Sequence, residues 1–88
     1  MQPSVAAIKR ACGKTIKGFR VKARLSQEEV AHDAGLNRSH MFRVESASSN
    51  PTVVTVIQLC AVMKVKPARF MREIERNLTV SANNANKP

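Results

Sequence analysis

The sequence is poor in cysteine, acidic residues and glycine, and it has no long apolar run. Its 88 residues include two cysteines, Cys12 and Cys60, which form no CxxC pair and are too few for a disulfide scaffold. Their spacings with His32 and His40 match no closed zinc site. Neither cysteine has a histidine and an asparagine or aspartate nearby in sequence, as nucleophilic catalysis would favour. We therefore expect no metal ion, no cofactor and no catalytic cysteine.

Membrane-spanning and enzymatic patterns are missing too. No apolar run approaches the roughly 18 residues of a membrane span, and the first twelve residues contain no apolar stretch typical of a signal peptide. No segment sets aromatic residues and leucine on one helix face opposite lysine and arginine, as a membrane-surface helix would. Glu28 and Glu29 are neighbours that point about 100° apart on a helix, so they form no catalytic pair. The sequence predicts a cytoplasmic protein that is not an enzyme.

Acidic residues are outnumbered by basic ones. The chain has 15 lysines and arginines against 6 aspartates and glutamates, a formal charge of +9 and a sequence pI near 10.6. This balance in a small domain favours an anionic partner, with nucleic acid first and a membrane surface second. A chain of 88 residues forms one domain with a marginal core, which dimerisation would stabilise.

Apolar residues recur at spacings of three and four rather than alternating, which predicts an all-α fold. The first predicted helix covers about residues 14–23, and Ser4 would cap a short extra helix that ends near Gly13. We therefore assign residues 1–12 to an N-terminal extension and residues 13–78 to the folded domain. The polar residues 79–88 are expected to form a disordered tail.

A capping box marks the start of the next helix, because Ser26 can accept from the third helical N–H while Glu29 reaches back. This helix ends at Gly35, which tolerates a left-handed turn, and Asn37 caps a second short helix. Two short helices joined by such a turn predict a helix-turn-helix over residues 26–45. Further helices are predicted over residues 53–63 and 68–77.

The second helix of this motif has two distinct faces. Stepped at 100° per residue, Met41 and Val44 fall together as a core stripe. The outward face carries two guanidinium groups, a hydroxyl and a phenyl ring: Arg38, Ser39, Phe42 and Arg43. Such groups can read the major groove, since arginine pairs with guanine, serine bonds several base edges and phenylalanine meets the thymine methyl. Gln27, beside free N–H groups at the start of the first helix, suits a phosphate contact.

Other interpretations of this face stay open. One interpretation is a solvated basic surface. Another is a contact for a partner protein, and the exposed ring of Phe42 is the main argument for it. An antitoxin-type or other protein-interaction module is therefore an alternative to a DNA regulator. A non-specific nucleic-acid binder is a second alternative.

Four stretches follow one another in a set order: Leu25 to Ala31, Ala34-Gly35-Leu36, Arg43-Val44-Glu45 and Asn50-Pro51-Thr52. This series resembles the lambda-repressor-like, Xre-type family of DNA-binding domains, and the resemblance runs from about Gly13 to Met71. It implies a five-helix bundle containing the helix-turn-helix, which binds double-stranded DNA at an inverted-repeat operator. It also implies a repressor or autoregulator on the nucleoid, similar to restriction-modification controller proteins, phage repressors and some antitoxins.

The resemblance implies roles for individual residues. Arg38, Ser39, Phe42 and Arg43 would contact bases. Arg20 would form a structural ion pair with Glu45. Contacts to the DNA backbone would come from Gln27, Asn37, His40, Ser49, Asn50, Thr52 and, secondarily, Arg20.

Two positions depart from the family pattern. Ala47 stands where the family commonly has glycine, and alanine in a left-handed backbone would cost about 1 kcal/mol. We therefore expect the loop to take another path. Phe42 occupies a position that is often small and polar, so we expect an unusual base preference.

Surplus apolar residues favour a homodimer. In the helix over residues 53–63, one row is assigned to the core: Val53, Val56, Leu59, Cys60 and Met63. The predicted interface combines a second row of that helix with residues of the last helix: Val54, Ile57, Ala61, Met71, Ile74 and Leu78. A single broad core face is the alternative.

Overall fold

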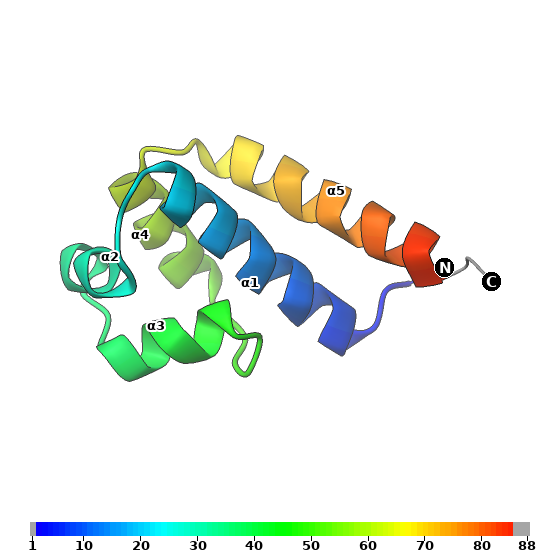
Figure 1. Ribbon diagram of the computed structural model, residues 1–88, viewed down its shortest axis with the longest axis horizontal. Helices are drawn as coiled ribbons and strands as arrows, with labels where there is room; N and C mark the ends of the chain where they lie inside the picture. The colour runs from blue at the N-terminus through cyan, green and yellow to red at the C-terminus, as the bar shows by residue number, and fades with distance from the viewer. Residues whose placement is uncertain (1, 86–88) are drawn as a thin grey trace.

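The computed structural model describes residues 2–85, which contain five α-helices and no strand (Figure 1). The helices are α1 (Val5–Lys22), α2 (Gln27–Ala34), α3 (Arg38–Glu45), α4 (Val53–Met63) and α5 (Pro67–Ala85). In Figure 1, α1 lies between α3 and α5, and it packs against both. The α2 helix packs against α3 and α4. The predicted all-α, five-helix fold is confirmed.

The first helix is continuous, so the predicted break near Gly13 is wrong. Ser4 caps this longer helix, its Oγ accepting from the backbone N–H of Ala7 at 3.1 Å. Gly13 serves a close approach between helices, because a Cβ built there would lie 2.5 Å from the carbonyl oxygen of Glu45. The tertiary contact with the end of α3 therefore explains a glycine that looks, in sequence, like a helix end.

The boundary predicted after residue 12 falls inside α1 and is also wrong. Ala11 and Cys12 are buried and belong to the same core cluster as residues from the other helices. Residues 1–12 therefore do not form a separate extension, because α1 extends the folded domain toward the N-terminus.

Local capping signals set the two short helices where the sequence predicts them. The Oγ of Ser26 accepts from the N–H of Glu29 at 3.0 Å, and Oε1 of Glu29 accepts from the N–H of Ser26 at 2.9 Å. Gly35 ends α2 with φ at +74°, a left-handed conformation that glycine adopts without steric cost. The Oδ1 of Asn37 then accepts from the N–H of His40 at 2.7 Å and starts α3.

The last helix is longer than predicted. It begins at Pro67 and continues to Ala85, so residues 79–85, expected in a disordered tail, are helical. No glycine or proline follows Pro67 before Pro88, and extending a helix costs far less than starting one. Residues 86–88 of the predicted tail lie outside the described residues.

All five helices contribute to one core, whose largest fully buried side chains include Phe70, Ile16, Met41, Leu59, Val30 and Val44. Val53, which the sequence assigns to the core row of α4, is instead 75% exposed, because the first residue of the helix lies beyond the core. Cys12 and Cys60 are free and buried, and burial raises the pKa of both thiols. Raised pKa values suppress the reactive thiolate, consistent with packing roles.

Candidate nucleic-acid interface

The predicted base-reading residues gather at one place on the surface. An open hollow of about 530 Å³ is lined by Gln27 of α2 together with Arg38, Ser39, Phe42 and Arg43 of α3. All four α3 side chains are exposed, and the ring of Phe42 is 58% exposed. We call these five residues the recognition surface. The opposite side of α3 is buried through Met41 and Val44, so the helix presents this face outward.

The recognition surface has the chemistry to read base edges. An α-helix with its side chains is about 10–12 Å in diameter, and the DNA major groove is about 12 Å wide, so α3 fits within it. Two guanidinium groups supply donors for guanine, and Ser39 can donate or accept. The exposed Phe42 ring offers an apolar contact for a thymine methyl.

A buried ion pair fixes the orientation of α3. Arg20 of α1 donates from Nε to Oε2 of Glu45 at 2.8 Å and from Nη2 to Oε1 at 2.7 Å. Its Nη1 donates to the carbonyl of Leu25 at 2.8 Å, and the two charged side chains are only 13% and 5% exposed. The hydrogen bond to Glu45 raises the pKa of Arg20. The structure thus has the ion pair that the resemblance implies.

This geometry argues against the secondary role expected of Arg20 as a contact to the DNA backbone. Its three nitrogens all donate inside the protein, and the side chain is largely covered. Moving the guanidinium to a phosphate would leave Glu45 as a buried, unpaired charge, which is strongly unfavourable. Arg20 is therefore a positioning residue for α3.

The other predicted backbone contacts do not line the recognition surface. The side chains of Asn37 and Thr52 cap α3 and α4, the latter accepting from the N–H of Thr55 at 3.1 Å. Asn50 is exposed and Ser49 is half-buried in the loop between these helices. The caps leave the Nδ2 donors of Asn37 available to a phosphate, whereas the Thr52 hydroxyl also donates to Oγ1 of Thr55 at 3.1 Å.

His40 is placed less favourably than expected for a DNA contact. Its side chain is half-buried, and its Nε2 is a buried atom without a hydrogen-bond partner among the described residues. That nitrogen cannot reach a phosphate in this rotamer. The contact of His40 with the DNA backbone stays a prediction.

One charged neighbour of the recognition surface was missed in the sequence. Glu28 of α2 pairs with Arg38, with Oε1 and Nη1 2.8 Å apart, and both side chains are mostly exposed. The 100° step along α3 places only the residues of that helix, so it gives no sign of this acid.

The match to known proteins is clearest across this part of the chain. Residues 16–70 match the sequence model of a family described as Helix-turn-helix, HTH_3. The match covers more than half of the chain and includes the whole recognition surface. The chain belongs to the Xre-type, lambda-repressor-like helix-turn-helix family. This places it among DNA-binding transcriptional regulators.

Solved structures share this fold. The restriction-modification controller protein C.AhdI from Aeromonas hydrophila is 29% identical, with a TM-score of 0.66, over 75% of this chain and 94% of its own. The clp gene regulator ClgR from Corynebacterium glutamicum is 14% identical, with a TM-score of 0.87, over 98% of this chain and 88% of its own. The restriction-modification controller protein C.Esp1396I is 20% identical, with a TM-score of 0.75, over 81% of this chain and 91% of its own. No curated protein matches the sequence significantly.

The loop after the recognition helix of this family member departs from expectation. Ala47 has φ at +67°, so it takes the left-handed conformation and not another path. The N–H of Ser48 donates to the carbonyl of Arg43 at 2.8 Å, and the N–H of Ala47 donates to that of Val44 at 3.3 Å. These two hydrogen bonds form the Schellman motif, which gives partners to carbonyl groups at the end of α3. The motif requires a left-handed residue at the position of Ala47.

Charge is distributed unevenly between the helix-turn-helix and the rest of the chain. Residues 26–45 contain two arginines and four acids, a net charge of −2. Residues 1–25 contain seven basic residues and no acid, a net charge of +7. The excess positive charge that suggested a nucleic-acid partner therefore lies mainly on α1 and outside the helix-turn-helix.

The predicted dimer residues divide into two groups. Val54, Ile57 and Met71 are 67%, 50% and 58% exposed, and Ala61 is also exposed. Ile74 is instead 6% exposed in the core, and Leu78 is half-buried against it, because α5 turns these positions toward α1 and α4. Among the described residues, Ile74 and Leu78 therefore pack within the domain. The apolar surface available to a dimer is smaller than the six predicted residues suggest.

Among residues 2–85, none of the helices combines the length and the hydropathy that a membrane span requires. The same residues contain no group of three or more histidine, cysteine, aspartate or glutamate side chains that could hold a metal ion.

Proposed function

We propose that the protein binds double-stranded DNA sequence-specifically as a homodimer and regulates transcription as a repressor or autoregulator. The observation that carries this proposal is the recognition surface. Five side chains suited to bases and phosphates converge on one exposed hollow, and a buried ion pair holds their helix in place. Binding to double-stranded DNA would place the protein on the nucleoid.

A dimer follows from the size of the reading element. One eight-residue helix covers only a few base pairs, whereas two-fold dimers of this motif read half-sites about 34 Å apart. The exposed side chains of Val54, Ile57 and Met71 supply apolar surface for such an interface. The 29% identity to a restriction-modification controller protein supports a regulatory role.

The dimer can be tested by sedimentation. Ile57→Glu should produce a folded monomer, because a carboxylate at a buried dimer contact would be desolvated. Val53→Glu is the matched control, since Val53 is 75% exposed on the same helix and lies outside the predicted interface. If Ile57→Glu still sediments as a dimer, the interface lies elsewhere.

Sequence-specific binding can be tested by selecting bound duplexes from a random DNA pool at physiological salt. An enriched inverted repeat, with half-site centres about one helical turn apart, is the expected result. Binding without enrichment would contradict the proposal and leave a non-specific nucleic-acid binder.

A protein-binding role is the second candidate, because the Phe42 ring is 58% exposed within a motif of net charge −2. An exposed aromatic on a unit with little positive charge also fits a protein contact. Purification from the native host separates the candidates. A stoichiometric protein partner, together with weak DNA binding by the isolated chain, would favour this second function.

A further inference from the structure

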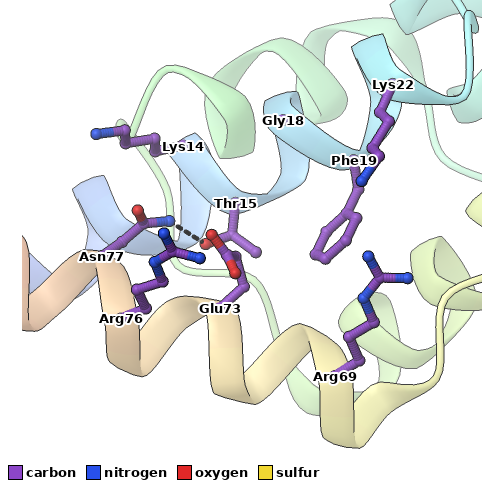
Figure 2. Close-up of a pocket in the computed structure, with 9 residues that line it drawn as sticks. All are labelled: Lys14, Thr15, Gly18, Phe19, Lys22, Arg69, Glu73, Arg76 and Asn77. Atoms are coloured by element: carbon purple, nitrogen blue, oxygen red, sulfur yellow. Dashed lines mark hydrogen bonds between the residues drawn. The ribbon is translucent and has the colours of Figure 1, made fainter.

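The α5 helix packs on the side of α1 that faces away from α3 (Figure 1). A hollow opens between α1 and α5. Figure 2 shows this hollow, of about 390 Å³, with side chains from both helices around it. We call it the α1–α5 groove. It shares no lining residue with the recognition surface. Its volume is within the range of pockets that bind small ligands.

The α1–α5 groove is strongly basic. Lys14 and Lys22 of α1 and Arg69 and Arg76 of α5 line it, against a single acidic lining residue, Glu73. Within residues 2–85, Glu73 has no ion-pair partner within 4 Å, so the four cations are not neutralised by pairing. Four like charges around one concave surface repel each other and raise the local concentration of anions.

The two ends of the groove differ in chemistry, as Figure 2 shows. Lys14, Glu73, Arg76 and Asn77 lie toward one end, whereas Phe19, Lys22 and Arg69 lie toward the other. The guanidinium carbon of Arg69 lies 5.4 Å from the centre of the Phe19 ring. This distance allows a cation–π contact, and a planar guanidinium can offer a flat surface to a planar ligand, while the first end offers point charges.

Part of the lining is held rigidly. Thr15 is 2% exposed, and its hydroxyl donates to the carbonyl of Ala11 at 2.7 Å. The same oxygen accepts from Nδ2 of Asn77 at 2.9 Å, the contact drawn in Figure 2. This bond fixes the amide of Asn77 beside Lys14 and Arg76, which pre-organises the cationic end.

Gly18 lies on the wall of the groove and has no packing reason to be glycine. A Cβ built there meets no atom within 4 Å, in contrast to the tight site at Gly13. Glycine inside a helix costs about 1 kcal/mol relative to alanine. Gly18 thus leaves this wall of the groove without a side chain.

We propose that the α1–α5 groove binds a nucleotide. The polyphosphate would lie at Lys14 and Arg76, and the base would stack on the guanidinium of Arg69. The whole lining has a net charge of +3, which attracts a polyanion, and the flat guanidinium of Arg69 suits a planar base. This site is independent of operator binding, so either proposal can fail without the other.

The test is titration of the full chain with ATP, inorganic tripolyphosphate and adenosine at about 150 mM salt, where weak surface attraction is screened. Binding is measured by calorimetry and located by amide chemical shifts. ATP should bind more tightly than tripolyphosphate and adenosine, with shifts concentrated at the groove residues. Equal binding of ATP and tripolyphosphate, or shifts spread over the whole basic surface, would overturn the proposal.

Matched variants separate the site from general charge. Lys14→Gln with Arg76→Gln should weaken ATP binding about tenfold or more. Lys17→Gln with Arg72→Gln removes the same charge from exposed positions of the same helices outside the groove and should change it little. An equal loss in both double variants would contradict a specific site.

Two single changes sharpen the assignment. Arg69→Lys keeps the charge but loses the planar stack, so it should weaken ATP about threefold or more and leave tripolyphosphate unchanged. Glu73→Gln should strengthen binding of both, whereas Glu75→Gln, outside the groove, should not. Unchanged ATP affinity in Arg69→Lys would remove the base from the proposed site.

Discussion

The helix-turn-helix and the frame around it differ in how they use charge. Residues 26–45 have a net charge of −2, yet they carry the side chains suited to base edges. Residues 1–25 have a net charge of +7, and α1 contributes to the core, to the ion pair that holds α3 and to a separate basic groove. Net charge therefore indicates the class of partner without locating the surface that recognises it.

The largest expected effect comes from cutting the link between these two regions. Glu45→Ala should lower the free energy of unfolding by about 3–5 kcal/mol, because it leaves the Arg20 guanidinium buried without its partner. Urea denaturation measures this directly. Glu28→Ala, which removes the exposed partner of Arg38, is the control and should cost at most about 1 kcal/mol. If Glu45→Ala left the free energy of unfolding and the melting temperature unchanged, the structural role of the pair would be contradicted.

The two glycines of α1 should respond in opposite directions. Gly13→Ala should destabilise the fold by about 1–3 kcal/mol, since the new Cβ would overlap the backbone at Glu45. Gly18→Ala should stabilise it by about 1 kcal/mol, because its Cβ meets open space in a helix. Thermal unfolding of both variants is the measurement. Equal effects would show that α1 does not approach α3 as described.

The loop that ends α3 offers a smaller stabilisation. Ala47→Gly should relieve the left-handed strain at φ +67° and add about 1 kcal/mol. For a domain of this size, that corresponds to a melting temperature about 4–8 °C higher. A lower melting temperature would mean that the methyl group of Ala47 contributes more by packing than it costs in strain.

The smallest expected effect concerns the acid beside the recognition surface. Glu28→Gln should raise DNA affinity a few-fold, because Arg38 no longer has to break its ion pair with Glu28 before it contacts DNA. The gain is small because an exposed pair of this kind contributes at most about 1 kcal/mol. Glu75→Gln makes the same charge change on α5 and should have less effect. Fluorescence anisotropy with a selected duplex measures both. Equal affinities for the two variants would show that the Glu28 pair does not limit binding.

Local signals in the sequence predict the helix-turn-helix well. Ser26, Gly35 and Asn37 act through hydrogen bonds and backbone conformations that span only a few residues, so the starts and ends of α2 and α3 are as predicted. The outward face of α3 follows from the 100° step, and the structure exposes the same four residues.

Features that depend on tertiary contacts could not be predicted in this way. Gly13 resembles a helix end until α3 is placed against it, and Ile74 resembles an interface residue until α5 is packed on the core. The Glu28–Arg38 pair joins two helices, so no periodicity within one helix reveals it. Ala47 is left-handed because the Schellman bonds at the end of α3 require it, whatever residue stands there.

The most direct test of the central claim compares specific with non-specific DNA binding in two arginine variants. Arg43→Ala removes a guanidinium from the recognition surface, whereas Arg72→Ala removes one from α5. We expect Arg43→Ala to lower the ratio of specific to non-specific affinity roughly 5- to 150-fold, which corresponds to about 1–3 kcal/mol of binding free energy. Arg72→Ala should leave this ratio unchanged. Equal ratios in the two variants would contradict base reading by α3.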